Sequence, residues 1–296
     1  MDCLQIVYSE GAWGDLVGVF HVSPGVGPNK GQHSQLYVAV ASTSDLGHWT
    51  VVNDSLPYAE AGSMGFIHID SSSGVTFLAY EAESSSGNAV FIRRYANIAI
   101  MLSKAGIFDE WQLTKQVHVA GAPRTWTADA RSVTNVGTPS IECLVGGDLT
   151  IRCHYSPDGA HDYPAKGMVS LGSEGGIEQN WASWAGFFDN WVNDSLRTLG
   201  ARGKIGGRDA IRWQGFWTLI NEAQMVQDDW SSWRVYLLVP ELRKAVPIPL
   251  SISGTRTFAN PHMTLLPGKR LLQTYFVPSQ KEGTLQPGTL LRASQL

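Results

Sequence analysis

Four residues carry side chains suited to moving protons or binding anions in a shared pocket. Arg152 and His154 are alternate residues of one predicted strand, so their side chains lie on the same face. Glu142 lies in the strand before them, and Asp209 begins another predicted strand. Histidine and carboxylates are common general acids and bases, and arginine stabilises acidic oxygens. We therefore predict Glu142, Arg152, His154 and Asp209 as catalytic residues.

A second group of residues offers flat apolar walls and a few polar groups for binding a ligand. Most of them immediately precede or begin a predicted first strand of a hairpin. They are Trp13, Asp15, Met64, Phe66, Trp126, Arg131, Arg208, Trp217, Asn260 and His262. Aromatic walls with a few fixed donors suit either a sugar or an unsaturated organic ligand. These ten residues are the predicted substrate-binding set.

Both groups depend on short strands for their positions. Alternating apolar and polar runs recur around glycine turns, and helical periodicity is nearly absent, as is typical of an all-β fold. Four similar hairpins are expected, at Phe66–Ile69 with Val75–Tyr80, Ser140–Leu144 with Leu149–Tyr155, Ala210–Trp213 with Phe216–Ile220, and His262–Leu266 with Arg270–Phe276. A fifth hairpin is expected between Val17–Val22 and Gln35–Ala41.

An acidic residue followed by tryptophan recurs after several of these hairpins, at Asp45–Trp49, Asp109–Trp111 and Asp229–Trp230. The spacing of roughly 50–70 residues is typical of a propeller blade with insertions. We therefore predict one five-bladed β-propeller over residues 1–296, with a central ligand pocket. A β-sandwich or jelly roll is the alternative, and it does not explain the order of hairpin and tryptophan.

Two segments are expected to complete this fold. Cys3–Tyr8 is predicted to pair into the last blade beside Thr289–Arg292, which would close the ring and remove exposed edges. Residues 172–202 contain three tryptophans and are interpreted as a pocket lid. A partner-binding patch, or a segment folded back on the third blade, is the alternative for that insert.

Composition narrows the classes of partner. Only 16% of residues are charged, with a net charge of −4, whereas nucleic-acid binders usually present a basic face. No apolar run approaches the roughly 20 residues that span a bilayer. No His, Asp, Glu or Cys cluster has metal-ligand spacing, so no metal ligands are predicted, although the channel of a propeller can hold a calcium ion without such a cluster. No cofactor is expected. The expected partner is a small molecule, without nucleic acid or membrane.

The sequence leaves the cellular compartment open. The chain begins without a signal-like stretch, which indicates an intracellular protein, whereas removal of a leader would be consistent with a secreted origin. Asn53 and Asn193 are in glycosylation sequons. Cys143 and Cys153 flank a glycine turn, where two free thiols are favoured over a cross-strand disulfide.

Several short motifs resemble those of the five-bladed propeller glycosidases related to arabinanases, xylosidases and invertases. They are Arg208-Asp209-Ala210-Ile211, Gly137-Thr138-Pro139-Ser140, Asn260-Pro261-His262 and Ser44-Asp45-Leu46-Gly47-His48-Trp49. The resemblance implies three acidic residues on different blades. Asp209 matches one of them and Asp15 stands for another, but Thr138 occupies the position of the acid before proline. Glu142-Cys143 is similar to a Glu-Cys pair of the invertase branch, three residues late.

Three functions follow from this incomplete carboxylate set. The preferred hypothesis is a non-hydrolytic cyclase of hetero-Diels–Alder type in fungal secondary metabolism, by analogy of fold and pocket with propeller hetero-Diels–Alderases. Such an enzyme would dehydrate its substrate to a quinone methide and then join it to a terpene in near-attack geometry. The alternative is a glycoside hydrolase, which needs two facing carboxylates. A lectin-like carbohydrate-binding module is third.

Overall fold

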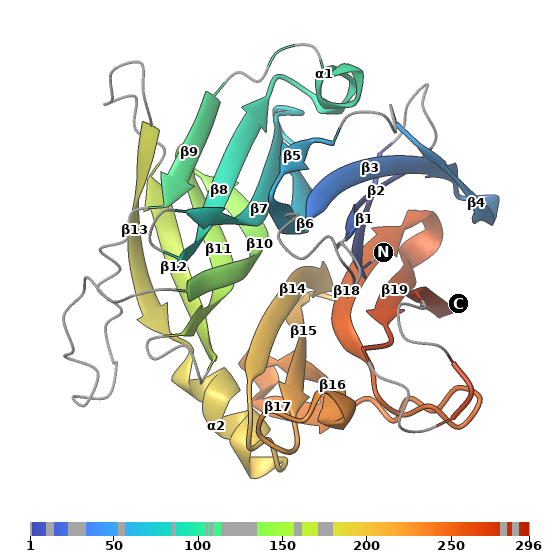
Figure 1. The fold of residues 1–296 in the computed structure, drawn as a ribbon. Coiled ribbons are helices and arrows are strands. Elements are labelled where there is room, and N and C mark those ends of the chain that lie inside the picture. The colour runs from blue at the N-terminus through green and yellow to red at the C-terminus, as the bar shows by residue number, and fades with distance from the viewer. Residues whose placement is uncertain are drawn as a thin grey trace, which may run out of the picture.

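The computed structural model describes residues 2–9, 15–22, 34–52, 57–84, 87–104, 106, 109–113, 135–156, 162–170, 180–278, 283–285 and 290–295. Over these residues the chain is mostly β-strand, with its sheets arranged around a common centre in a propeller-like fold (Figure 1). No helix in the described ranges combines the length and the apolar character that crossing a membrane requires.

The described strands form four hydrogen-bonded sheets. The first contains β1 (Asp2–Tyr8), β2 (Leu16–Val22), β3 (Gln35–Ser42) and β4 (Asp45–Val51), with β5 (Ala59–Glu60) paired to β3. The second contains β6 (Gly62–Ile69), β7 (Thr76–Ser84), β8 (Gly87–Tyr95), β9 (Asp109–Leu113), β10 (Asn135–Val145), β11 (Asp148–Ser156), β12 (Tyr163–Ser170) and β13 (Asn180–Phe188). The third contains β14 (Ile205–Trp213), β15 (Phe216–Gln224), β16 (Trp233–Val239) and β17 (Lys244–Pro247). The fourth contains β18 (Ala259–Leu266), β19 (Arg270–Phe276) and β20 (Leu290–Gln295).

The eight-stranded sheet corrects the predicted number of blades. It consists of two antiparallel runs, β6 to β9 and β10 to β13, and β13 pairs with β9 in parallel. A single parallel pairing between Asn135 and Asn88 also joins β10 to β8. The described chain therefore has four sheets rather than five separate blades, because hydrogen bonds between their outer strands merge these two runs.

Each of the three smaller sheets is one run of strands, and the eight-stranded sheet contains two. The first strand of each run lies near the centre of the molecule (Figure 1). β1, β6, β10, β14 and β18 contact one another in that cyclic order, with β18 returning to β1. The predicted ring closure was wrong, because β1 pairs with β2 as the first strand of its own sheet, while β20 pairs with β19. Side chains instead join the last sheet to the first: the hydroxyl of Thr264 donates to Ile6 O, and that of Thr274 to Leu4 O at 2.5 Å.

The predicted hairpins are confirmed as β2–β3, β6–β7, β10–β11, β14–β15 and β18–β19. Their turns depend on glycine where the backbone enters the left-handed region. Gly147, with φ of +95°, lies between β10 and β11, a conformation that an L side chain rarely adopts. Cys143 and Cys153 are free thiols, as favoured from the sequence.

The hydrophobic core lies between neighbouring sheets. Phe66, Phe77, Ile141 and Ile151 belong to one buried cluster that joins the two runs of the eight-stranded sheet. Other clusters join the first sheet to β6–β8, and the third sheet to the fourth. Because each interface buries apolar side chains from both partners, packing holds the first strands at fixed positions around the centre.

The remaining elements are short helices. They are α1 (Ile98–Ser103), α2 (Asn190–Thr198) and the 3-10 turns η3 (Trp230–Ser232), η4 (Pro240–Leu242) and η5 (Pro267–Lys269). In the predicted insert 172–202, residues 180–188 form β13, the outer strand paired with β12 and β9, and α2 follows. Val192 and Leu196 of α2 pack into the core of the third sheet, and the role of the insert as a lid stays a prediction.

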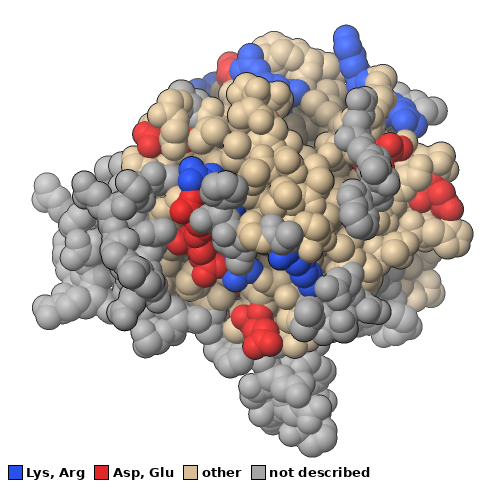
Figure 2. All heavy atoms as spheres, turned by 90° about the horizontal axis from the view of Figure 1, so that it is seen from above, with Lys and Arg blue, Asp and Glu red and all other residues tan. Residues whose placement is uncertain are grey.

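Charged residues are sparse among the described residues on one face of the molecule. Figure 2 shows a face on which most of the described atoms belong to uncharged residues, with acidic and basic groups occurring in small mixed groups. This agrees with the low fraction of charged residues, 16%, in the sequence. The described charged groups on this face therefore do not form a broad patch of one sign.

Candidate functional site

The first strands share an irregularity near their beginnings. The register shifts between Ser63 and Phe66 in β6, between Gly137 and Ser140 in β10, and between Ala259 and His262 in β18. Each of these bulges contains two residues, and the first of the two has a positive φ of 48–49°: Met64, Thr138 and Asn260. Left-handed non-glycine residues cost of order 1–3 kcal/mol and cluster at functional sites, so these positions indicate a candidate site.

In each of these three bulges, a backbone amide donates a hydrogen bond to a side chain from the second strand of the preceding run. The amide of Thr138 donates to Glu81 Oε2 of β7 at 2.9 Å, and that of Asn260 donates to Glu222 Oε2 of β15. The amide of Met64 donates to Nδ1 of His21 in β2 at 3.4 Å. A polar side chain of one run thus binds the backbone of the next. Because of this repeated contact, Glu81 and Glu222 join neighbouring runs in addition to offering carboxylates to a ligand.

His154 departs from this repeat. It faces Gly137 in the ladder, as Glu81 faces Ser63, but no bond from His154 to the backbone of the following run is seen among the described residues. Its Nδ1 lies 2.8 Å from Oγ1 of Thr138. Its Nε2 is buried and has no hydrogen-bond partner among the described residues. Buried polar atoms are nearly always paired, so an orphaned imidazole nitrogen indicates a place for a ligand or water.

One cavity gathers these groups, and we name it the N-terminal cavity because it lies at the beginnings of the first strands. Its volume is about 210 Å³, and the side chains that line it include Glu81, Thr138, His154, Asp162, Glu222 and Asn260. Met64, Lys204, Trp230 and Trp233 also line it. It combines carboxylates, one imidazole and indole rings, which is the chemistry of a polar organic ligand.

A second cavity lies further along the same first strands, and we name it the opposite cavity. It has a volume of about 520 Å³ and is lined by Phe66, Glu142, Asp209, Arg212 and Trp217, together with apolar residues of β1, β6, β14 and β18. The guanidinium of Arg212 lies over the ring of Trp217, 5.7 Å from its centroid. The predicted site residues that line a cavity are thus divided between two cavities instead of meeting in one.

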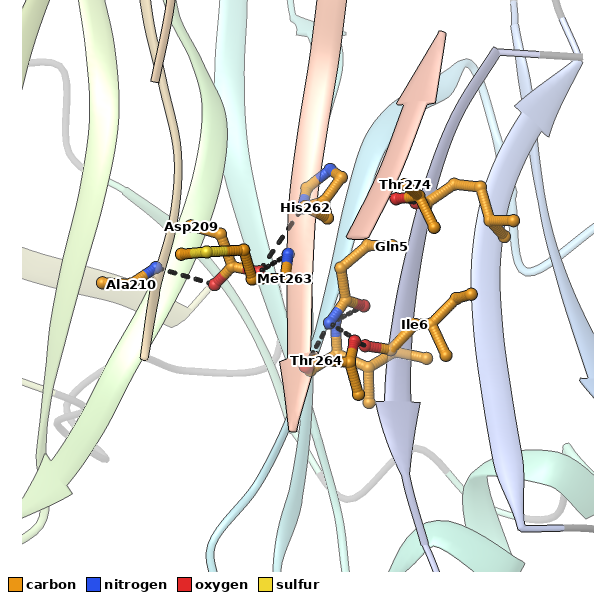
Figure 3. A network of polar contacts seen from close by, with 10 residues as sticks. Gln5, Ile6, Asp209, Ala210, His262, Met263, Thr264 and Thr274 are labelled. Atoms are coloured by element: carbon orange, nitrogen blue, oxygen red, sulfur yellow. Dashed lines mark hydrogen bonds and ion pairs between the residues drawn. The ribbon is translucent and has the colours of Figure 1, made fainter. Parts of the chain in front are cut away.

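Asp209 of the opposite cavity is occupied by backbone contacts (Figure 3). Its Oδ1 accepts the amide of Ala210 at 2.7 Å, and its Oδ2 accepts the amide of Met263 at 3.0 Å. Nδ1 of His262 lies 3.8 Å from the same Oδ2. Figure 3 also shows Gln5 of β1 among the neighbouring first strands; its amide group donates to Ile67 O and accepts from Ile67 N. Asp209 therefore joins β14 to β18.

Glu142 and Arg152 are brought together, but as part of a buried ion-pair network. Glu142 pairs with Arg152 and, at 2.5 Å, with Lys166 Nζ, while Arg152 also donates to Asp189 Oδ2 at 2.7 Å. Burial opposes the charge of Arg152, but the carboxylates of Glu142 and Asp189 outweigh it and raise the pKa of this guanidinium. Because Asp189 also caps α2, the network joins β10, β11 and β12 to that helix.

The other predicted binding residues are scattered. Met64 and Asn260 line the N-terminal cavity, Phe66 and Trp217 line the opposite cavity, and the ring of His262 lies 6.1 Å from that of Phe66. Asp15 accepts two hydrogen bonds from Thr43, in the turn between β3 and β4, and these lower its pKa. Trp13, Trp126, Arg131 and the side chain of Arg208 lie outside the described residues.

Sequence reasoning missed Glu81, Glu222, Asp162, Lys204 and Trp233 as lining residues. A signal for Glu81 exists, because aligning the hairpins by their registers places it at the position of His154. Asp162 and Lys204 precede strands and carry no such pattern. Among the described residues, no group of three or more His, Cys, Asp and Glu side chains is arranged to hold a metal ion.

Comparisons with known proteins show the fold alone. No family model and no curated protein match the chain. A mutant of the GH43 protein BlXynB from Bacillus licheniformis matches 92% of this chain with a TM-score of 0.53 and 10% identity; the chain covers 48% of its length, about half. A putative glycoside hydrolase from Parabacteroides distasonis matches with a TM-score of 0.53 and 10% identity, covering 99% of this chain and 86% of its own. A GH43 endo-arabinanase from Bacillus licheniformis matches with a TM-score of 0.50 and 10% identity, covering 99% of this chain and 93% of its own. The chain shares an all-β, propeller-like fold with these proteins.

Proposed function

We propose that the chain is a glycoside hydrolase that binds a sugar in the N-terminal cavity and transfers protons through His154. The observation that carries the proposal is the buried, unpaired Nε2 of His154 in a cavity that Glu81 and Glu222 also line. The fold supports it, because three structurally similar proteins are described as GH43 proteins or as a putative glycoside hydrolase. Their likeness favours hydrolysis over the cyclase hypothesis.

The proposed reaction uses one imidazole as acid and then as base. Protonated His154 donates the Nε2 proton to the glycosidic oxygen, the bond from that oxygen to the anomeric carbon breaks, and the alcohol leaves. The carboxylates of Glu81 and Glu222 stabilise the positive charge that develops on the sugar ring. Water then attacks the anomeric carbon and gives a proton to Nε2, which restores the protonated imidazole and completes hydrolysis.

Thr138 is the positioning residue in this scheme. Its hydroxyl lies 2.8 Å from Nδ1 of His154, and its backbone amide is bound by Glu81. One residue therefore sets the orientation of the imidazole relative to a carboxylate. In the protonated ring both nitrogens are donors, so the bond to Thr138 directs the second donor, Nε2, away from it.

Hydrolysis of 4-nitrophenyl glycosides of neutral pentoses and hexoses tests the proposal. The substitution His154→Gln should lower kcat/KM by about 10²–10⁴-fold, the range of general acid–base catalysis. Exposed His48→Gln and exposed Glu60→Gln are the matched controls and should keep wild-type activity. Thr138→Val should shift the pH profile of kcat, since it removes the partner of Nδ1. Hydrolysis that persists in folded His154→Gln would overturn the role of His154.

A non-hydrolytic cyclase of hetero-Diels–Alder type is the second candidate. One observation favours it: the carboxylates expected from glycosidase motifs do not meet, because Asp15 is bonded to Thr43 and Asp209 to backbone amides. His154 would then serve the dehydration step alone. Incubation with a quinone-methide precursor and a humulene-type alkene separates the two candidates. A stereoselective adduct without glycoside cleavage would replace the hydrolase proposal.

A further inference from the structure

One wall of the N-terminal cavity contains two further orphaned polar atoms. Asp162 and Trp233 are 8% and 5% exposed, and both line the cavity. Oδ1 of Asp162 and Nε1 of Trp233 are buried without a hydrogen-bond partner among the described residues. A carboxylate oxygen can only accept and an indole nitrogen can only donate. The wall thus presents one unused acceptor and one unused donor, in addition to Nε2 of His154.

The backbone fixes both groups relative to Lys204. The carbonyl of Asp162 accepts the amide of Ile205 at 3.2 Å, and Oδ2 of Asp162 lies 3.7 Å from Nζ of Lys204. Gln224 binds the amide of Lys204 through its side chain and pairs with Trp233 in the β15–β16 ladder. Asp162, Lys204 and Trp233 are therefore held in one arrangement before a ligand arrives, which lowers the entropic cost of binding.

We propose that Asp162, Trp233 and Lys204 bind two neighbouring hydroxyls of a neutral sugar ring, and we name this group the diol wall. Each hydroxyl both donates and accepts, so one hydroxyl donates to Oδ1 of Asp162 while hydroxyl oxygens accept from Nε1 of Trp233 and Nζ of Lys204. Trp230 is 60% exposed, with its ring 6.0 Å from that of Trp233, and offers an apolar face for the C–H side of the sugar. The inference rests on the proposed function for placing a sugar in this cavity.

The charge of the cavity selects a neutral ring. Three carboxylates, those of Glu81, Glu222 and Asp162, line it, whereas Lys204 is the one lysine or arginine among the described lining residues. Lys204 already faces Asp162. A sugar carboxylate would meet like charges, and the described lining residues offer no guanidinium to bind it; such a contact is costly inside a protein. Uronic acids should therefore bind more weakly than the corresponding neutral sugars.

Direct binding by saturation-transfer NMR and calorimetry tests the diol wall without requiring turnover. The probes are D-xylose, L-arabinose and D-galactose, with 2-deoxy-D-galactose and D-galacturonate as matched analogues. Trp233→Phe removes the donor but keeps a ring, and Asp162→Asn replaces the charged acceptor by an amide of similar size. Each substitution should raise the Kd for the neutral sugar that the wild type binds most tightly by about tenfold or more. Trp213→Phe, at the end of β14 and outside the lining of both cavities, is the control and should leave binding unchanged.

The outcomes separate this inference from the proposed function. Weaker sugar binding in folded Trp233→Phe and Asp162→Asn, without any hydrolysis by the wild type, would support the diol wall and overturn the hydrolase. Hydrolysis that depends on His154, together with wild-type sugar affinity in Trp233→Phe and Asp162→Asn, would support the hydrolase and overturn the diol wall. Galacturonate bound as tightly as galactose would also overturn the neutral-sugar inference. Absence of binding by every sugar would overturn both.

Discussion

The carboxylate of Asp209 accepts the backbone amide of Met263 at 3.0 Å and so joins the first strand of the third sheet to that of the fourth. The same carboxylate accepts the amide of Ala210 with its other oxygen. With both oxygens occupied by backbone donors, Asp209 is placed to hold two sheets together. Its sequence context resembles a catalytic aspartate of propeller glycosidases, yet its contacts are those of a structural residue.

We therefore expect Asp209→Asn to reduce stability more than chemistry. The new amide has one oxygen for two backbone donors, and its NH2 group would face one of those N–H groups. This should lower the free energy of unfolding by about 1–3 kcal/mol, measured from urea denaturation. Asp228→Asn is the control, because this residue is exposed and has φ of +58°, which asparagine tolerates well. A large loss of kcat at unchanged stability would show a catalytic role instead.

Glu142→Gln should be strongly destabilising. Glu142 is buried between Arg152 and Lys166, so its neutralisation leaves two cations with a single remaining carboxylate, Asp189. Removal of one partner from a buried pair typically costs about 3–5 kcal/mol. A double-mutant cycle with Lys166→Gln should give a coupling energy above zero, because the lysine loses its partner in the single variant. Unfolding curves that match those of the wild type would contradict this account.

Gly137→Ala should disturb the N-terminal cavity directly. A Cβ atom at this position would overlap the carboxylate of Glu81 and lie 2.7 Å from Cε1 of His154. Activity and sugar binding should fall by about tenfold or more, since misplacement of a catalytic group by an ångström is enough for such losses. Gly207→Ala is the matched control, because its nearest neighbour, Nδ2 of Asn221, would be 3.5 Å away. Equal activity of the two variants would exclude the proposed arrangement.

His68 should make the stability of the protein depend on pH. Burial lowers its pKa below 6.5, and the nearby Asp70 and Asp209 offset only part of that effect. Between the lower folded pKa and 6.5 the unfolded chain binds more protons than the folded one, so stability falls as pH decreases through this window. The urea midpoint, followed from pH 7.5 downward, should decline less in His68→Gln than in the wild type. Exposed His48→Gln should retain the wild-type slope.

The sequence was informative about local pairing. Alternating apolar residues around glycine turns predicted all five hairpins, because strand alternation and left-handed turn residues are local properties. His154 could also be selected, since it lies in a predicted strand on the same face as Arg152. The state of Cys143 and Cys153 as free thiols followed from composition and position.

Contacts between sheets were beyond the sequence. The parallel pairing of β13 with β9 joins Gln112 to Trp181, and no local pattern encodes it. The register of each strand decides which cavity a side chain reaches, so Asp209 of β14 and His154 of β11 are at different sites. Glu81 was missed because a carboxylate in a second strand has the same sequence appearance as a solvent-facing one.

The seam between the last sheet and the first differs from the joint within the eight-stranded sheet. There, backbone pairs tie two runs together, whereas among the described residues the seam is held by side-chain bonds such as those of Thr264 and Thr274, and by packing. A force that pulls the two ends of the chain apart would act on the contact between the last sheet and the first. Among the described strands, no ladder of backbone hydrogen bonds crosses this contact and would have to break first. Under mechanical force the closed ring should thus open there, while the merged pair of runs stays intact.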